Sequence, residues 1–225
     1  MIDIDKKYFH KIDNFLDLKT CESLKNKFFD LVEINSESAI KERDKGREEF
    51  YSIKDHDIFK KFTNKVVLQL SELLKKDLAH SYTYITLYKP GAKLYEHVDR
   101  PHSQYGININ LWKNTEWPIF LKHPETKEII RIDQNPGDAF IYKGIEVPHF
   151  RSELKEGDSL QFMVFAVEKN TPYEQFADDK FAENSGWNDC EYPNKEEHLK
   201  IAKYYSEKIE NGIDINEEYL RSLGL

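Results

Sequence analysis

The chain has 225 residues, and its 33 Lys and Arg against 41 Asp and Glu give a formal charge of -8. This length suits one domain with a single core, and the acidic balance excludes a basic coat for binding nucleic acid. Hydrophobic residues make up 39% of the chain and aromatic residues 13%, which excludes a disordered composition.

The cysteine count and the lack of long apolar runs indicate where the protein works. Cys21 and Cys190 are too few for a disulfide framework, so a reducing compartment is expected. No run approaches the about 18 apolar residues of a membrane span, and the N-terminus lacks the apolar stretch of a signal peptide. We expect a soluble cytoplasmic protein with no membrane or nucleic-acid partner, and the oligomeric state stays open.

The first 80 residues are predicted to form a helical support. Apolar side chains recur at helical spacing in two stretches, the first of them after Asp17, a candidate N-cap. Residues 36–50 between the stretches are polar and charged and are predicted to form a loop. The apolar positions are Cys21, Leu24, Phe28, Leu31 and Val32, then Phe59, Phe62, Val66, Leu70 and Leu74.

Between residues 81 and 170 the period changes from helical to strand-like. The connections are short, which favours antiparallel pairing, because parallel crossovers need about a dozen residues or more. The pattern predicts a sandwich or jelly roll, and the fold class is mainly β with flanking helices (α+β). The predicted strands are SYTYITLY (81–88), YGININLW (105–112), WPIFLKH (117–123), EIIRID (128–133), DAFIY (138–142), HFRSEL (149–154) and SLQFMVFAV (159–167).

Residues 171–225 form a polar and aromatic C-terminal extension. We predict a helix over 195–210 and a shorter one over 215–223, which pack on the jelly roll or act as a lid. No linker or repeat interrupts the sequence, so residues 1–225 are expected to form a single domain.

Two histidines and one carboxylate are the strongest candidates for metal ligands. His97 and Asp99 are two residues apart, so in an extended strand they point to the same face. His149 opens a later predicted strand, where an antiparallel neighbour brings it close. Such a set leaves adjacent positions open on the ion, as in non-haem Fe(II) oxygenases. Taken alone, Asp99 also fits a turn cap, and His149 also fits a core histidine.

The order of the motifs around these residues carries a family resemblance. The chain reads Tyr88-Lys-Pro-Gly91, His97-Val-Asp99, Pro136-Gly-Asp-Ala-Phe-Ile-Tyr142 and Gly144-Ile-Glu-Val-Pro-His149-Phe-Arg151. This series resembles the 2-oxoglutarate- and Fe(II)-dependent oxygenase superfamily, particularly its prolyl-hydroxylase-like branch, over residues 10–168. The resemblance implies a double-stranded β-helix (cupin-like jelly roll), iron ligands His97, Asp99 and His149, and the use of Fe(II), 2-oxoglutarate and O2.

The resemblance also implies a site for the distal carboxylate of 2-oxoglutarate, which needs a cation and a hydroxyl group. Tyr88 stands where the branch has a tyrosine that bonds this carboxylate. The family has a Lys or Arg at the position of Ser159, ten residues after His149, so this chain departs from the pattern. Arg151 is the best substitute, because it is expected to share the inward face with His149. Further candidates are Lys122, which ranks second as the cation, and Asn108, Asn110 and Gln161 as polar contacts.

The implied activity is hydroxylation of a C–H bond in an amino acid, a peptidyl residue or another small molecule, with release of succinate and CO2. Related halogenases leave the carboxylate position as Gly or Ala, so Asp99 favours hydroxylation. Arg100, Tyr105 and Trp112 lie near the iron motif and are predicted substrate contacts. Two alternatives remain: a non-catalytic jelly-roll binding module, and a cupin-like metal dioxygenase or isomerase that does not use 2-oxoglutarate.

Overall fold

The computed structural model describes residues 2–34 and 50–211. Residues 36–49 of the predicted polar loop and the predicted helix over 215–223 lie outside this range. Among the described residues, no helix is long and apolar enough to cross a membrane.

The described residues of the N-terminal part form three helices: α1 (Ile4–Lys7), α2 (Leu18–Ile34) and α3 (Asp57–Leu74). The two longer ones confirm the predicted helical stretches. The Asp17 carboxylate accepts a hydrogen bond of 2.8 Å from the Thr20 backbone N–H, as expected of an N-cap.

Within residues 2–34 and 50–211, ten strands form two antiparallel sheets, which we call the major and the minor sheet. The major sheet has the order β1 (Phe9–Ile12), β8 (Ala139–Tyr142), β5 (Tyr105–Lys113), β10 (Ser159–Glu168), β3 (Leu78–Tyr88) and β2 (Phe50–Lys54). The minor sheet has the order β4 (Leu94–His97), β9 (His149–Arg151), β6 (Ile119–Lys122) and β7 (Ile129–Ile132).

Strands β3 to β10 close into a double-stranded β-helix, so the predicted fold class is confirmed. β1 and β2 extend the two edges of the major sheet. Both strands come from the region that was predicted to be helical. A short strand on a sheet edge gains its stability from its neighbour rather than from its own residue pattern, which is why the sequence did not reveal them.

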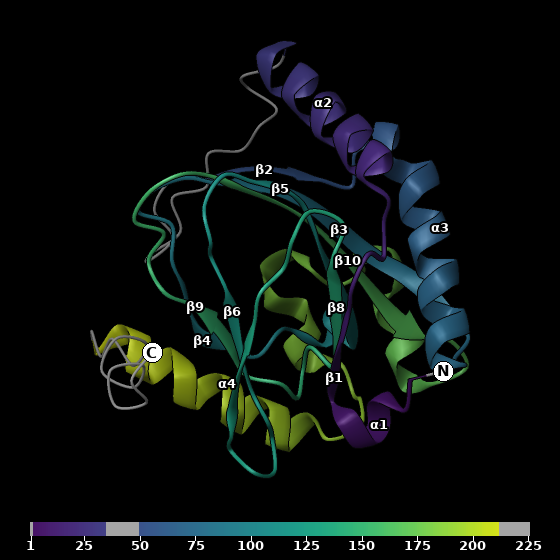
Figure 1. Ribbon diagram of the computed structural model, residues 1–225. Coiled ribbons are helices and arrows are strands. Elements are labelled where there is room, and N and C mark those ends of the chain that lie inside the picture. Colours follow the sequence, from purple (N-terminus) through teal and green to yellow (C-terminus); the bar gives the residue numbers. More distant parts are fainter. Residues whose placement is uncertain (1, 35–49, 212–225) are drawn as a thin grey trace.

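Helices α2 and α3 cover the outer face of the major sheet (Figure 1). Alternate residues of β5 and β10 point outward and bury their side chains against these helices. The ring of Phe162 on β10 is fully buried and lies 5.1 Å from Phe62 and 6.3 Å from Phe59, both on α3. This contact anchors β10, which lies between β5 and β3 in the major sheet, against α3.

We expect Phe162→Ala to lower the free energy of unfolding by about 3–5 kcal/mol, since it leaves a cavity that the helices cannot fill. Urea denaturation followed by circular dichroism measures the change. Leu68→Ala on α3 is the control, because that side chain is exposed and its loss should change stability by less than about 0.5 kcal/mol. Equal effects of the two substitutions would contradict the assigned packing.

The C-terminal part consists of the 3-10 segments η2 (Pro172–Asp179) and η3 (Glu183–Asp189) and of helix α4 (Lys195–Glu210). α4 matches the predicted helix over 195–210. It lies across the outer face of the minor sheet, beside β4, rather than over the helices of the N-terminal part (Figure 1). A second apolar cluster fills the space between the two sheets and includes Tyr82, Leu121, Tyr142 and Phe165.

Candidate metal centre

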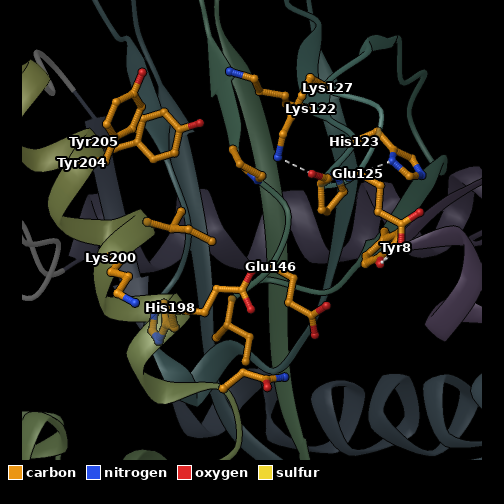
Figure 2. Close-up of a pocket in the computed structure, with 16 residues that line it drawn as sticks. Tyr8, Lys122, His123, Glu125, Lys127, Glu146, His198, Lys200, Tyr204 and Tyr205 are labelled. Carbon is orange, nitrogen blue, oxygen red and sulfur yellow. Dashed lines mark hydrogen bonds between the residues drawn. The ribbon is translucent and has the colours of Figure 1, made fainter.

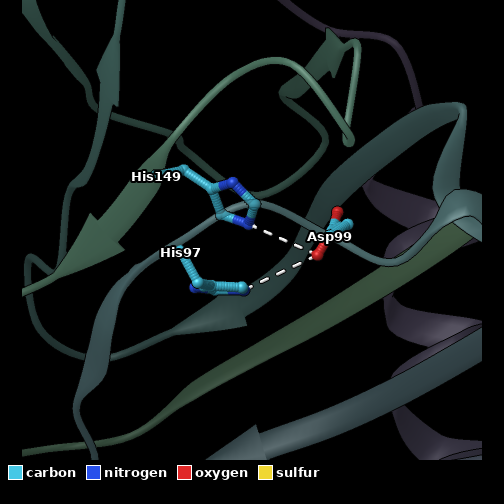
Figure 3. A group of neighbouring side chains, drawn as sticks. All are labelled: His97, Asp99 and His149. Carbon is cyan, nitrogen blue, oxygen red and sulfur yellow. Dashed lines mark ion pairs between the residues drawn. The ribbon is translucent and has the colours of Figure 1, made fainter. Parts of the chain in front are cut away.

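His97, Asp99 and His149 converge at one end of the barrel (Figure 3). His97 ends β4, His149 begins β9, and the two are directly paired across the antiparallel strands. The Nε2 atoms of His97 and His149 lie 3.6 Å and 3.7 Å from Asp99 Oδ1. One potential ligand atom from each residue lies within 4.8 Å of the others, so the predicted triad is brought together.

Backbone carbonyls set the orientation of both imidazole rings. His97 Nδ1 lies 2.7 Å from the carbonyl oxygen of Tyr95, and His149 Nδ1 lies 2.9 Å from that of Val147. A carbonyl only accepts, so each Nδ1 carries the proton and each Nε2 presents a lone pair. Both lone pairs are therefore available to a metal ion.

The Asp99 carboxylate is held so that one oxygen faces the histidines. Its Oδ2 accepts a hydrogen bond of 2.9 Å from the Tyr142 hydroxyl, and its backbone N–H donates to the Gly144 carbonyl at 2.9 Å. Gly106 makes room for the tyrosine, because a Cβ there would lie 2.6 Å from the Tyr142 ring. Tyr142 therefore orients the carboxylate of Asp99.

The protonation states suit metal binding. Burial, with a smaller contribution from His97, lowers the pKa of His149 to about 4 against the opposing effect of Asp99. Burial alone would raise the pKa of Asp99, but His149, His97 and Tyr142 together hold it below its usual value. At neutral pH the centre offers a neutral imidazole from His149 and a carboxylate from Asp99.

This donor set fits a ferrous ion. Two imidazole nitrogens and one carboxylate oxygen lie within 4.8 Å of one another, and two histidines with one carboxylate are the ligands of non-haem Fe(II) centres. The hydrogen-bonded Nδ1 atoms supply the outer support that such ligands need.

We expect Gly144→Ala to weaken metal binding by about 10-fold. A Cβ at Gly144 would lie 2.8 Å from Asp99 Oδ2 and 2.3 Å from the Ser103 carbonyl oxygen, so the carboxylate must shift. Anaerobic calorimetric titration with Fe(II) measures the dissociation constant. Gly186→Ala is the control, because the nearest atom to its Cβ would be 3.7 Å away. Unchanged affinity in Gly144→Ala would show that the Asp99 position tolerates the shift.

A cavity of about 160 Å³ opens beside the triad. Tyr88, predicted to bind the co-substrate, lines it at the end of β3 and packs against Trp117, with ring centroids 4.9 Å apart. Sequence reasoning missed several other lining residues. Nothing in the sequence places the edge strand β2 here, whereas Tyr84 and Thr86 alternate with Tyr88 on β3, and this spacing could have indicated them. The missed residues include Phe50, Ser52, Tyr84, Thr86, Lys93 and Met163.

Arg151 points into the barrel on the same side of β9 as His149, as predicted from their spacing. The residue is only 3% exposed. Its guanidinium lies 4.6 Å from the Trp117 ring centroid, donates to the Trp117 carbonyl, and lies 3.4 Å from Gln134 Oε1. Burial lowers the pKa of Arg151 to about 10, with Tyr88 and Tyr142 opposing the shift. The side chain is therefore still charged at neutral pH.

Amide side chains surround this end of the barrel. Asn108 on β5 is paired with Met163, and Asn110 is paired with Gln161, on the inward face of the major sheet. Within the described part of the chain, Asn108 Oδ1, Asn110 Oδ1 and Gln161 Oε1 are buried without a hydrogen-bond partner. Buried polar atoms in this state indicate a site for water or a polar ligand.

Lys122 lies on the opposite side of the minor sheet. Leu121 is paired with His149 and Phe120 with Phe150, so the side chain of Lys122 points outward. Its Nζ lies 3.0 Å from Glu96 Oε1 and lines a separate cavity beside α4. This placement contradicts the co-substrate role predicted for Lys122.

Tyr105 and Trp112 also point away from the triad. Tyr105 is buried in the core under the helices, and its hydroxyl lies 3.2 Å from Glu168 Oε2. Trp112 packs 6.3 Å from Phe29 of α2. The predicted substrate contacts at these two positions are therefore wrong.

Arg100 stays on the triad side of the molecule. Its guanidinium carbon lies 4.3 Å from the ring centroid of Tyr82, which lines the triad cavity. Arg100 Nη2 is 2.5 Å from Asp179 Oδ1, and Lys54 pairs with the other oxygen of that carboxylate. Tyr82, which forms part of the cavity wall, is therefore flanked by two cations, Arg100 and Lys54, and by one acid, Asp179.

Comparisons with known proteins agree on the fold. No protein-family model matches the chain, and no curated protein sequence matches it. A prolyl-4-hydroxylase from Pseudomonas putida superposes with a TM-score of 0.59 at 12% identity, over 75% of this chain and 96% of that one. A prolyl hydroxylase from Trichoplax adhaerens, in complex with a hypoxia inducible factor peptide fragment, gives 0.62 at 12% identity, over 74% and 86%.

A third similar structure is HygX from Streptomyces hygroscopicus with nickel, 2-oxoglutarate and hygromycin B bound. Its TM-score is 0.59 at 12% identity, over 75% of this chain and 86% of that one. At these identities the likeness establishes the double-stranded β-helix fold.

Proposed function

We propose that the protein is an Fe(II)- and 2-oxoglutarate-dependent dioxygenase that hydroxylates a C–H bond and releases succinate and CO2. The observation that carries the proposal is the cluster of His97, Asp99 and His149, with Arg151 buried on the inward face of β9 that His149 also occupies. A metal centre and a buried cation on one barrel wall suit a co-substrate that chelates the metal at one end and carries a carboxylate at the other.

In this proposal each part of the barrel has one role. His97, Asp99 and His149 hold the ferrous ion, which supplies the site where O2 is activated. Arg151 binds the distal carboxylate of 2-oxoglutarate through its guanidinium, and the Tyr88 hydroxyl is a second donor. Asn108 and Gln161 complete the polar surroundings, because their amides can turn to present either a donor or an acceptor.

The substrate that is hydroxylated binds against the aromatic wall of the triad cavity. Tyr82, Tyr84 and Phe165 line this wall, and Arg100 lies over Tyr82. We propose Arg100 as the substrate contact, and an amino acid, a peptidyl residue or another small molecule as the substrate. The similar structures bind a peptide fragment in one case and hygromycin B in another, so the fold accommodates both kinds.

Succinate formation tests the proposal. Purified protein supplied with Fe(II), 2-oxoglutarate and O2 should release succinate, and omission of any one of them should stop the release. His97→Ala should be inactive under the same conditions. If wild-type protein binds no Fe(II), the alternative of a non-catalytic jelly-roll binding module is favoured. Oxygen uptake that is indifferent to 2-oxoglutarate would instead favour a cupin-like dioxygenase.

A further inference from the structure

Three charged side chains from three separate segments meet at the aromatic wall of the triad cavity. Arg100 follows the predicted metal ligand Asp99, Lys54 ends β2, and Asp179 ends η2. Arg100 Nη2 lies 2.5 Å from Asp179 Oδ1, and the Lys54 ammonium group pairs with Oδ2 of the same carboxylate. The two cations are therefore spaced so that each binds one oxygen of a single anion.

Both cations lie on the side of the major sheet that faces the cavity. Arg100 Cζ lies 4.3 Å from the ring centroid of Tyr82, and Lys54 Nζ lies 5.9 Å from the same centroid. Lys54 is paired with Tyr84 on β3 and shares a face of β2 with Ser52, two residues away. Tyr82, Tyr84 and Ser52 all line the cavity. A molecule bound against this wall is therefore within reach of both cations.

The neighbouring acids lie on the other side of β3. Asp55 and Asp178 line a separate cavity together with Thr83 and Ile85. Successive residues of a strand point to opposite faces, so Thr83 and Ile85 face away from the wall that the tyrosines form. Among the described residues, the two cations at the wall form ion pairs with one carboxylate, that of Asp179. One positive charge at the wall is therefore not balanced by an ion pair.

The larger cavity beside α4, of about 660 Å³, differs in this respect (Figure 2). Lysines and glutamates line it in equal number: Lys122, Lys127 and Lys200, and Glu125, Glu146 and Glu197. The excess of cations is therefore a feature of the wall at the triad cavity, although the chain as a whole has a formal charge of -8. Such a local excess attracts an anionic ligand.

The backbone that presents Asp179 is held in an unfavourable conformation. Asp178, Asp179 and Phe181 have φ angles of 54°, 55° and 62°, in the left-handed region that residues other than glycine seldom adopt. Such conformations persist where surrounding contacts impose them. The contacts here are the ion pairs of Asp179 and the approach of His102 Nε2 to the Lys180 carbonyl oxygen at 2.5 Å. An anion that replaced the Asp179 carboxylate would relieve part of this strain.

We propose that the substrate carries an anionic group with at least two oxygens, a carboxylate or a phosphoryl group, which Arg100 and Lys54 bind in exchange for the Asp179 carboxylate. The inference rests on the proposed function only in taking the triad cavity as the substrate site. In the free protein Asp179 holds the two cations in place, so they are preorganised for the incoming group. Charge-assisted hydrogen bonds then fix one end of the substrate at the wall.

The test is an NMR titration of the metal-free protein with sodium phosphate and, separately, with sodium acetate, at constant ionic strength. Asp179→Asn removes the competing charge and keeps the shape of the side chain. This variant should bind at least one of the two anions about 10- to 150-fold more tightly than the wild type, the factor that corresponds to a hydrogen bond with a charged group. The changes in amide chemical shift should centre on Arg100 and Lys54.

Adding Arg100→Gln or Lys54→Gln to Asp179→Asn should remove the gain in affinity. Asp133→Asn is the matched control, because it also releases an arginine from its aspartate, at the exposed pair of Arg131 and Asp133. Its affinity for both anions should equal that of the wild type. Circular dichroism checks that each variant is folded, and Asp179→Ser takes the place of Asp179→Asn if the latter does not fold.

Affinities in the folded Asp179 variant that equal those of the wild type would overturn the inference. A gain of the same size in Asp133→Asn, or shifts that centre away from Arg100 and Lys54, would also overturn it. Where the gain is found, the more tightly bound anion indicates whether the substrate group is a carboxylate or a phosphoryl group. The titration contains neither Fe(II) nor 2-oxoglutarate, so its result is independent of the succinate assay that tests the proposed function.

Discussion

Arg151→Met should weaken the binding of 2-oxoglutarate to the metal-loaded protein by about 10- to 150-fold. A hydrogen bond to a charged group contributes about 1.5–3 kcal/mol, and each 1.4 kcal/mol is a factor of about ten in affinity. Arg151 is 3% exposed, so water does not replace the lost contact. Anaerobic titration of the Fe(II)-loaded protein with 2-oxoglutarate measures the change.

The same substitution is not expected to destabilise the protein when the co-substrate is absent. Replacing a buried guanidinium by an apolar side chain of similar length removes the cost of burying its charge, which offsets the loss of its hydrogen bonds to the Trp117 carbonyl and to Gln134 Oε1. Arg131→Met is the matched control, because that arginine is exposed on β7 and paired with Asp133 at 2.9 Å. Its affinity for 2-oxoglutarate should equal that of the wild type.

Arg151→Lys distinguishes the shape of the cation from its charge. Lysine keeps the positive charge but loses the planar fork that grips a carboxylate with two parallel hydrogen bonds. We expect an affinity between those of the wild type and Arg151→Met. Wild-type affinity in Arg151→Met would mean that another group anchors the distal carboxylate.

The residue pattern placed His97 and Asp99 on one face because that part of the geometry is local, whereas His149 was assigned with the help of the motif series that carries the resemblance. Two ligands two residues apart in an extended segment share a face by the pleat of the strand, and His97 and His149 are paired across β4 and β9. Arg151 follows His149 at the same spacing and is also inward. Tyr142 ends the motif over 136–142, which contributes to the family resemblance. Its hydrogen bond to Asp99, however, depends on Gly106 of another strand.

The wrong predictions concern which face of a strand a residue occupies. Tyr105 and Asn108 are three apart on β5 and therefore point to opposite faces, so the alternation already argued against assigning both to the site. Trp112 shares the parity of Asn108 and Asn110, but it is paired with Leu160 while Asn110 is paired with Gln161. The bulge between them turns Trp112 to the outer face, and the sequence gives no sign of this bulge.

The direction of the Lys122 side chain could not be predicted from the sequence, because it depends on how the strands pair. Its direction follows from the register that pairs Leu121 with His149, and a register between strands far apart in sequence is fixed by the packed core rather than by local residues. The same reason applies to β2, which brings Phe50 and Ser52 to the triad cavity from the region predicted as helical support.

Asp99→Ala should weaken Fe(II) binding by more than about 100-fold, since a direct ligand contributes more than the outer contacts, whose loss costs about 10- to 100-fold. Without Asp99, bound Fe(II) would have only the imidazoles of His97 and His149 as protein ligands. No negatively charged ligand would then balance the charge of the ion. Succinate formation should be lost together with Fe(II) binding. Anaerobic calorimetry with Fe(II) measures the first effect, and an assay of succinate the second.

A second change in the same variant separates the metal effect from folding. Asp99→Ala leaves the buried Tyr142 hydroxyl without its acceptor, which should cost about 1–3 kcal/mol in the free energy of unfolding. Adding Tyr142→Phe removes the unsatisfied hydroxyl and should restore most of that stability. Because the carboxylate ligand is still missing, Fe(II) binding should stay lost in the double variant. If the double variant regained Fe(II) binding along with stability, Asp99 would be a structural partner of Tyr142 rather than a ligand.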